Sequence, residues 1–443
     1  MRIHSKSLGF SVVFGMMFCS AVSFAVDGIN PGPNLTTGPS SNHFSLYAAS
    51  YNPAMAPLVV PADERFRFSY LPSISIGVEI GDVANFADDL DELIDLIETP
   101  ESNTEPVNEV LDRFNAVLAR MGQDGYIKNS ANVGLPGAPF YFRSEGLQGT
   151  LFFDVNQGYQ ASVSVLDDTL SFNEPLQTFT TDTSIYLKSG IETKYTVGYG
   201  RQIDPVPSFI PLAGKLYAGA KLNFYQIELS KQVTRLEDLD GEEVSDVIKD
   251  EYDKNLNSSS NIGIDVGLLW DADWYQLGVR LDNINSPAFE YGDIGTNCDD
   301  LDENTIERNS CEVSRSFIAD GRLKGSEKHT KHALLRVDGM LQVSDRWFVS
   351  SGLDLAEYDD IVGYENQWLN LAMSYESVSY YVPSARVGYQ MNLAGTKLSS
   401  YTMGFTFFKT MSLDFEMSSE SAEVDGNSAP RRFGFSLAFT EHF

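Results

Sequence analysis

The side chains best able to do chemistry in this sequence are few and scattered. Four histidines follow the first 25 residues, namely His43, His329, His332 and His442. His329 and His332 would share a face on a helix, but on a strand they point to opposite faces, and a lysine precedes each of them. None of the four stands in a recognisable setting beside a nucleophile or paired carboxylates. We therefore expect no enzyme, no metal site and no cofactor.

Acidic side chains are abundant but do not form a recognisable site. The chain has 62 Asp plus Glu against 31 Lys plus Arg, a formal net charge of −31. So acidic a chain repels phosphate backbones, which excludes nucleic acid as a partner. Asp238 and Asp240 before Gly241 match half of a calcium loop, but the remaining ligand spacing is absent. We expect a solvated loop there.

The first 25 residues have the pattern of a secretory signal. Arg2 and Lys6 precede an apolar run, and Ser23 and Ala25 frame a small-x-small site, which predicts cleavage after Ala25. An uncleaved membrane anchor is the alternative. Cys19 does not indicate a lipoprotein, because the bulky Phe18 precedes it.

Export bears on the two remaining cysteines, Cys298 and Cys311. An oxidising compartment favours a disulfide between them, worth roughly 3 kcal/mol for so short a loop. Two free thiols are the alternative, and the spacing matches no zinc pattern.

Beyond Asp63 most of the chain alternates apolar and polar residues with period two, as β-strands with one apolar face do. Short connections alternate with long acidic ones, and the polar faces carry Arg280, Asp338 and Arg386 in mid-strand. This pattern favours an outer-membrane barrel over a soluble sandwich. We predict an all-β fold: an antiparallel barrel of about 14 strands over residues 63–443, preceded by an extended or plug segment, residues 26–62.

Residues 83–121 have a different character and predict a helical insertion in the barrel domain. Two amphipathic stripes, around Leu93 and Phe114, are separated by Pro100 and Pro106. Because each apolar face must be buried, we expect the pair inside or beneath the barrel, restricting its lumen. The alternative is a surface hairpin that packs on itself.

The C-terminus ends in an alternating apolar strand. Phe435, Leu437, Phe439 and the final Phe443 resemble the signal that outer-membrane barrels present to their assembly machinery, although Glu441 departs from it. The expected partners are therefore outer-membrane lipid and the barrel assembly machinery, and the expected location is the outer membrane of a Gram-negative bacterium.

Three segments resemble known families. Asn52, Pro53 and Ala54 resemble a signature of the long-chain fatty-acid and aromatic-hydrocarbon channels, and form a candidate plug motif. Residues 277–289 and 387–396 resemble the exported conjugal-transfer (plasmid-transfer-operon) TraF proteins. No Cys-x-x-Cys is present, so the thiol chemistry of the thioredoxin-like proteins that share the name is not implied.

Two functions follow from these resemblances. One is a channel or binding barrel for a hydrophobic small-molecule ligand. The other is a structural envelope component linked to conjugative transfer, without transport activity. The sequence does not separate them.

Overall fold

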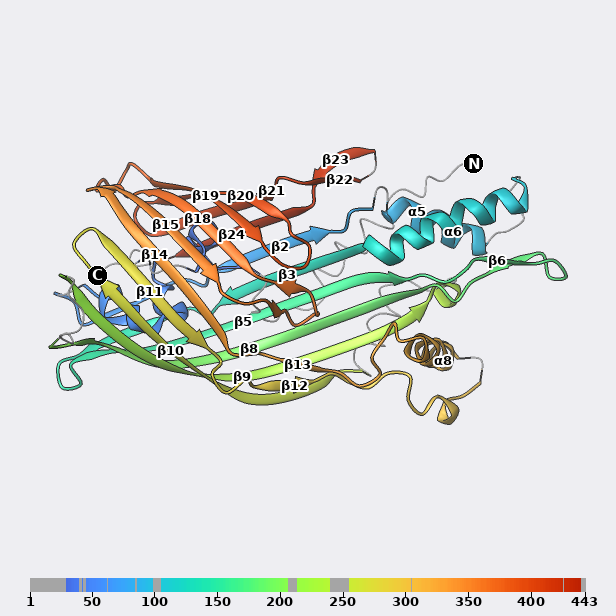
Figure 1. Cartoon of the computed structure of the whole chain (residues 1–443), viewed down its shortest axis with the longest axis horizontal. Coiled ribbons are helices and arrows are strands. Elements are labelled where there is room, and N and C mark those ends of the chain that lie inside the picture. Colours follow the sequence, from blue (N-terminus) through green and yellow to red (C-terminus); the bar gives the residue numbers. More distant parts are fainter. Residues whose placement is uncertain are drawn as a thin grey trace.

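The computed structural model is a closed antiparallel β-barrel of fourteen strands, which confirms the predicted fold class (Figure 1). It describes residues 29–39, 42, 45–61, 63–83, 86–98, 105–205, 213–239, 255–303, 305–424 and 426–439. Around the ring the strands are β5 (Gly149–Leu166), β3 (Tyr126–Gly134), β2 (Ile74–Ile80), β24 (Arg432–Phe439), β21 (Met411–Ser418), β20 (Ser399–Phe407), β19 (Ser384–Asn392), β18 (Trp368–Tyr375), β15 (Trp347–Asp354), β14 (Leu334–Ser344), β11 (Tyr275–Asp282), β10 (Asn257–Asp271), β9 (Lys215–Arg235) and β8 (Ser184–Ile203). Pairing of β8 with β5 closes the ring, and β1 (Phe66–Phe68) and β4 (Phe140–Ser144) add to the edge of β5.

At the height of the membrane the strands present an apolar face outward and a polar face to the lumen. In β24, Phe433 is 49% exposed on the outer face, whereas Ser436 of the opposite face is fully buried. The same alternation places exposed leucine, isoleucine, valine, phenylalanine and methionine side chains on nearly every wall strand. An apolar outer belt and a polar interior are the features of a transmembrane barrel.

The connections divide between the two ends of the barrel (Figure 1). One end carries short turns such as residues 272–274 and 345–346, and the other carries the long connections between β2 and β3, β11 and β14, and β15 and β18. Exposed Trp274, Trp347 and Tyr381 cluster at the short-turn end, as aromatic residues do at a membrane interface. By the rule for such barrels, the long-loop end faces the cell exterior.

The wall is much taller on one side. β8 has 20 residues and β9 has 21, whereas β21 and β24 have 8 each. Since 9–11 residues suffice to cross a bilayer, the long strands continue well beyond the lipid at the long-loop end. The strand β9, at about 3.3 Å per residue, is about 70 Å long. Beyond the lipid, apolar residues on both faces of these long strands must be buried by other segments of the chain.

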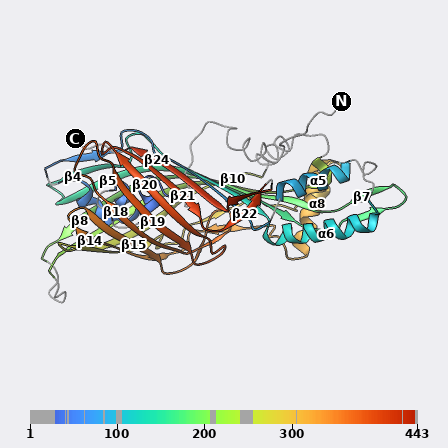
Figure 2. The same cartoon turned by 90° about the horizontal axis from the view of Figure 1, so that it is seen from above.

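The predicted helices are present as α5 (Phe86–Glu98) and α6 (Val107–Asp124), but their expected position inside or beneath the barrel is wrong. Val110, Phe114 and Leu118 of α6 pack with Leu93 of α5 and Ile185 of β8. In β8, Ile185 shares a face with the exposed Tyr195 and Val197 and so lies on the outer side. The helices therefore cover the outside of the tall wall beyond the membrane (Figures 1 and 2). The exposed Glu92, Glu109 and Asp112 remain in water there, whereas on the lipid-facing part of the wall they would have to be desolvated.

The long connection between β11 and β14 contains a helix that the sequence did not reveal, α8 (Ile306–Ala319). Val313 and Phe317 of α8 pack with Leu166 and Val233, which lie on the lumen side of the tall wall. The other short elements are η3 (Leu236–Leu239), η4 (Cys298–Asp300) and the hairpins β6–β7 (Ser171–Asn173, Thr178–Thr180), β12–β13 (Ala288–Glu290, Lys328–Thr330), β16–β17 (Tyr358–Asp359, Glu365–Asn366) and β22–β23 (Ser421–Val424, Asn427–Pro430).

Some sequence predictions lie outside the described residues: the signal segment 1–25 with its cleavage site, Phe443 at the C-terminus, and Asp240 with Gly241 of the half calcium loop.

The described part of the chain contains no helix that is both long and apolar enough to cross a membrane.

The lipid-facing assignment can be tested with a charge. Leu371, in the middle of β18, is 51% exposed, and an arginine at the bilayer midplane costs about 2–4 kcal/mol. We expect Leu371→Arg to lower the free energy of unfolding in bilayers by that amount, measured by urea titration. Leu176→Arg, at an exposed apolar position of the β6–β7 connection, is the control and should unfold like wild type. Equal stabilities of the two variants would contradict the assignment.

Candidate functional site

The N-terminal segment of the described chain lies inside the lumen. The described residues between 29 and 61 include α2 (Asn34–Thr37), α3 (Ala48–Tyr51), η1 (Pro53–Met55) and α4 (Ala56–Val59), and most of their side chains are buried. Pro53 ends α3, because the residue before a proline avoids the helical region. We call residues 29–61 the plug.

Three glycines on neighbouring strands form the seat of the predicted plug motif, residues 52–54. Gly200 in β8, Gly219 in β9 and Gly267 in β10 are paired in register. A Cβ on Gly219 would lie 2.6 Å from the Ala54 amide nitrogen, and Cβ atoms on the other two glycines would also overlap plug atoms. The absence of side chains on this row therefore permits the plug backbone to lie directly on the wall.

Polar contacts fix the same part of the plug. Asn52 Oδ1 accepts the Ala54 N–H at 3.1 Å, and Asn52 Nδ2 donates to the Leu268 carbonyl of β10 at 3.2 Å. Ser50 Oγ donates to Asp154 Oδ2 of β5 at 2.6 Å. The three predicted motif residues are thus buried together against β8, β9 and β10.

The other end of the plug is bound to the opposite wall. The Gly32 N–H donates to Ser436 Oγ of β24 at 2.7 Å, and Thr36 Oγ1 donates to Asp414 Oδ1 of β21 at 2.5 Å. Asp414 also forms a buried ion pair of 2.6 Å with Arg386, one of the mid-strand cations noted in the sequence. The plug therefore crosses the lumen from wall to wall.

Ion pairs between neighbouring strands line the rest of the lumen. They include Arg432–Glu79 (2.9 Å), Arg432–Glu416 (2.8 Å), Arg336–Asp282 (2.7 Å), Arg336–Asp354 (2.8 Å) and Lys221–Asp265 (3.3 Å). Two further pairs are Arg280–Asp282 within β11 (3.2 Å) and Lys331–Glu192 between the long connection after β13 and β8 (2.9 Å). Arg280 is 2% exposed, as expected for a charge facing a polar lumen. Such a lining suits water and polar solutes, because an apolar solute would separate these charges from water.

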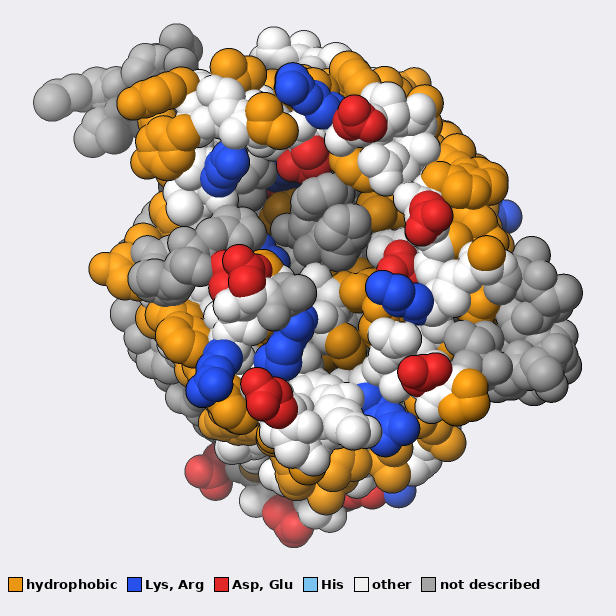
Figure 3. Space-filling model, turned by 90° about the vertical axis from the view of Figure 1, so that its left-hand side faces the viewer, with side chains coloured by type: hydrophobic (Ala, Val, Ile, Leu, Met, Phe, Trp, Pro, Cys, Tyr) orange, Lys and Arg blue, Asp and Glu red, His pale blue; other side chains and the backbone are white. Residues whose placement is uncertain are grey.

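Two principal cavities lie on opposite sides of the plug. A cavity of about 440 Å³ lies between the short-turn end and the plug residues Pro33, Leu58 and Val59. A cavity of about 110 Å³, which we call the chamber, lies between Tyr47 and Tyr51 of the plug and the long loops. Viewed from the short-turn end, the molecule is hollowed at its centre, with acidic and basic side chains around the hollow and apolar ones on the outer rim (Figure 3).

His329 and His332, the closely spaced histidines of the sequence, lie on different sides of the chain. His329 is buried within β13, whereas His332 is exposed just beyond it, although both border the chamber. Among the described residues no group of three or more His, Cys, Asp or Glu side chains is placed to hold a metal ion. The absence of an enzyme activity and of a cofactor stays an expectation.

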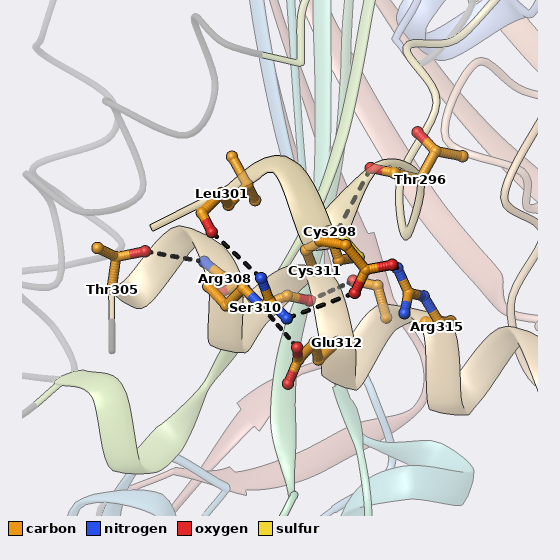
Figure 4. The surroundings of a disulfide bond; sticks show 11 residues. Thr296, Cys298, Leu301, Thr305, Arg308, Ser310, Cys311, Glu312 and Arg315 are labelled. Atoms are coloured by element: carbon orange, nitrogen blue, oxygen red, sulfur yellow. Dashed lines mark hydrogen bonds and ion pairs between the residues drawn. A yellow bond between two sulfur atoms is a disulfide. The ribbon is translucent and has the colours of Figure 1, made fainter. Parts of the chain in front are cut away.

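The predicted disulfide between Cys298 and Cys311 is confirmed, with Cα atoms 5.5 Å apart (Figure 4). It ties η4 to α8 in the long connection between β11 and β14. Arg308 reinforces the same turn through the Leu301 carbonyl at 3.2 Å and Glu312 at 2.6 Å. The bond therefore stabilises this connection, residues 283–333, which we call the outer cap and which lies far from the plug (Figure 1).

The described part of the predicted C-terminal signal lies on the lipid-facing side. Phe435, Leu437 and Phe439 alternate in β24 with the lumen-facing Gly434, Ser436 and Ala438. Phe435 contacts Phe415 of β21, with ring centroids 5.4 Å apart. Recognition by assembly machinery stays a prediction.

Sequence reasoning missed the glycine row and the plug's contacts with the opposite wall. Each glycine stands in a separate alternating segment, so no local pattern links Gly200, Gly219 and Gly267. Their shared register appears once the strands are paired.

A family model described as F plasmid transfer operon, TraF, protein matches residues 49–354. Comparison with curated proteins finds no significant match. Among solved structures, the Pseudomonas putida toluene transporter TodX is 12% identical, with a TM-score of 0.43 over 96% of this chain and 100% of that one. A Pseudomonas aeruginosa FadL homologue is 12% identical, with a TM-score of 0.35 over 95% and 99%. Structural similarity at this level does not indicate a function.

Removing the disulfide should loosen the outer cap alone. A cross-link of this span is worth about 3 kcal/mol on the chain-entropy estimate. In the double variant Cys298→Ser, Cys311→Ser we expect faster proteolysis between η4 and α8 and an unchanged shift of gel mobility on boiling. Ser316→Ala, an exposed position of α8, is the control. Proteolysis at the wild-type rate in the double variant would show that the bond does not stabilise the cap.

Proposed function

The chain belongs to the family described as F plasmid transfer operon, TraF, protein, and on that premise we propose that it is an outer-membrane channel held closed by its own plug. The observation that carries the proposal is the plug on its glycine seat, with a cavity on each side. Removal of residues 29–61 from the lumen would join the two cavities into one path. A purely structural barrel has no need of such an interrupted path.

The lining of the lumen supports a polar solute. The chamber is bordered by Asp265, Arg280, Asp282 and Arg336, together with asparagines and tyrosines. A small molecule with several hydrogen-bonding groups would replace the water there at little cost, whereas a hydrocarbon would displace that water and offer these charged groups no hydrogen bond in return.

A hydrophobic ligand is the second candidate. The cavity at the short-turn end has an apolar side formed by Leu58, Val59 and Phe348, which supports binding of a molecule with an apolar part. A non-transporting role in conjugative transfer has the family description as its support. Uptake of a labelled apolar compound by cells, compared with plasmid transfer from a deletion strain, separates these two alternatives.

The plug proposal predicts the effect of one methyl group. Gly219→Ala places a Cβ against the plug backbone, and overpacking of this kind costs about 1–3 kcal/mol. The plug should leave its seat about 5–150 times more often, since each 1.4 kcal/mol is a factor of ten. In planar bilayers we expect channel openings to become more frequent by that factor.

The control is Gly352→Ala in β15. A Cβ at Gly352 meets its nearest neighbour, Asp338, at an ordinary 3.8 Å, so openings should match wild type. Heat-dependent gel mobility verifies that both variants are folded. A folded Gly219→Ala variant with wild-type openings would reject the plug as the closing element.

A further inference from the structure

The connection between β15 and β18, residues 355–367, is a loop whose tip is buried. It contains the β16–β17 hairpin, and at its tip Asp360 is 4% exposed, Ile361 1% and Val362 4%. Surface loops normally leave their tips in water. We call residues 355–367 the strap.

The strap reaches the wall opposite to the one from which it starts. In the ring, β18 lies seven strands from β5, which is half of the barrel. Nevertheless Asp360 Oδ2 lies 3.5 Å from Lys128 Nζ of β3 and accepts from Gln160 Nε2 of β5 at 3.4 Å. The Tyr364 hydroxyl is 2.9 Å from Ser162 Oγ of β5. The strap therefore crosses the full width of the lumen.

The strap tip has a seat like that of the plug. A Cβ on Gly190 of β8 would lie 2.5 Å from Ile361 Cδ1, so the glycine leaves space for the isoleucine. The Tyr291 hydroxyl donates to the Ile361 carbonyl. Burial raises the pKa of the Tyr291 phenol well above its usual value, which keeps the donating proton in place. Ile361 and Val362 also pack with Ile227 and Leu229 of β9.

One carboxylate both shapes the strap tip and binds it to the far wall. Asp360 Oδ1 accepts the N–H groups of Val362 at 3.1 Å and Tyr364 at 2.8 Å. Its other oxygen faces Lys128 and Gln160. Loss of the Asp360 side chain thus removes the turn and the anchor together.

The chamber lies between strap and plug. Tyr358, Asp359, Asp360 and Ile361 border it on the long-loop side, and the plug borders it on the other. We propose that the strap is an outer gate which closes the chamber toward the cell exterior, independently of the plug. This inference deepens the channel function proposed above, with two gates in series around one solute-sized space.

Accessibility of the chamber tests the gate without requiring conduction. Asn156 of β5 borders the chamber, and Cys298 and Cys311 are paired, so Asn156→Cys provides a free thiol in the chamber. We would measure its rate of reaction with a small charged methanethiosulfonate reagent in purified full-length protein that also carries Cys19→Ser, so that no other thiol reacts. Asp360→Ala in this background should raise the rate at least tenfold. Glu357→Ala, an exposed carboxylate of the same strap, is the matched control and should leave it unchanged.

Ile361→Ser is a second variant in case Asp360→Ala does not fold, and heat-dependent gel mobility checks both. The gate proposal is overturned if the folded strap variants react within twofold of the Asn156→Cys background. It is also overturned if that background reacts as fast as an exposed loop thiol. Neither readout depends on channel openings, so failure of the gate and failure of the channel function are distinguishable.

Discussion

The structure depends on one constraint: a backbone that crosses lipid by strands must pair every N–H and C=O group within the sheet. Closure of β8 onto β5 satisfies this requirement, because a closed ring has no edge. Closure at fourteen strands then leaves a lumen too wide for wall side chains to fill. At the height of the membrane the polar faces of the strands point into that lumen, where ion pairs and inserted segments of the chain provide their hydrogen-bonding partners.

Glycine positions decide where those segments lie. The row Gly200, Gly219 and Gly267 receives the plug, and Gly190 receives the strap. At both places a missing side chain lets a second layer of chain lie directly on the wall, and polar contacts from Asn52 and Asp360 then fix it. Packing and hydrogen bonding thus act on the same short segments, so a change of one residue can shift the balance between closed and open lumen.

The tall wall explains the position of the helices. Toward the short-turn end the outer face of the barrel contacts lipid, whereas toward the long-loop end β5, β8 and β9 extend into water. There the apolar residues on both of their faces must be buried. The pair α5 and α6 covers the outside, and α8, held by the disulfide, covers the inside. The apolar stripe of α5 and α6 is therefore buried without bringing their acidic faces near the membrane.

The sequence by itself determined most of the features that rest on local periodicity or on a short separation along the chain. Alternation indicated the barrel class and the lipid-facing side of strands such as β24, and the 3.6-residue stripes indicated α5 and α6. A separation of 13 residues, in a chain predicted to be exported, indicated the Cys298–Cys311 bond. The helix α8 was missed because its buried face mixes Ser310 and Ser314 with Val313 and Phe317, which weakens the stripe. Tertiary structure alone decided the side on which α5 and α6 pack, the alignment of the glycine row and the path of the strap across the lumen. Each depends on the register between strands far apart in the chain, and no local sequence pattern encodes that register.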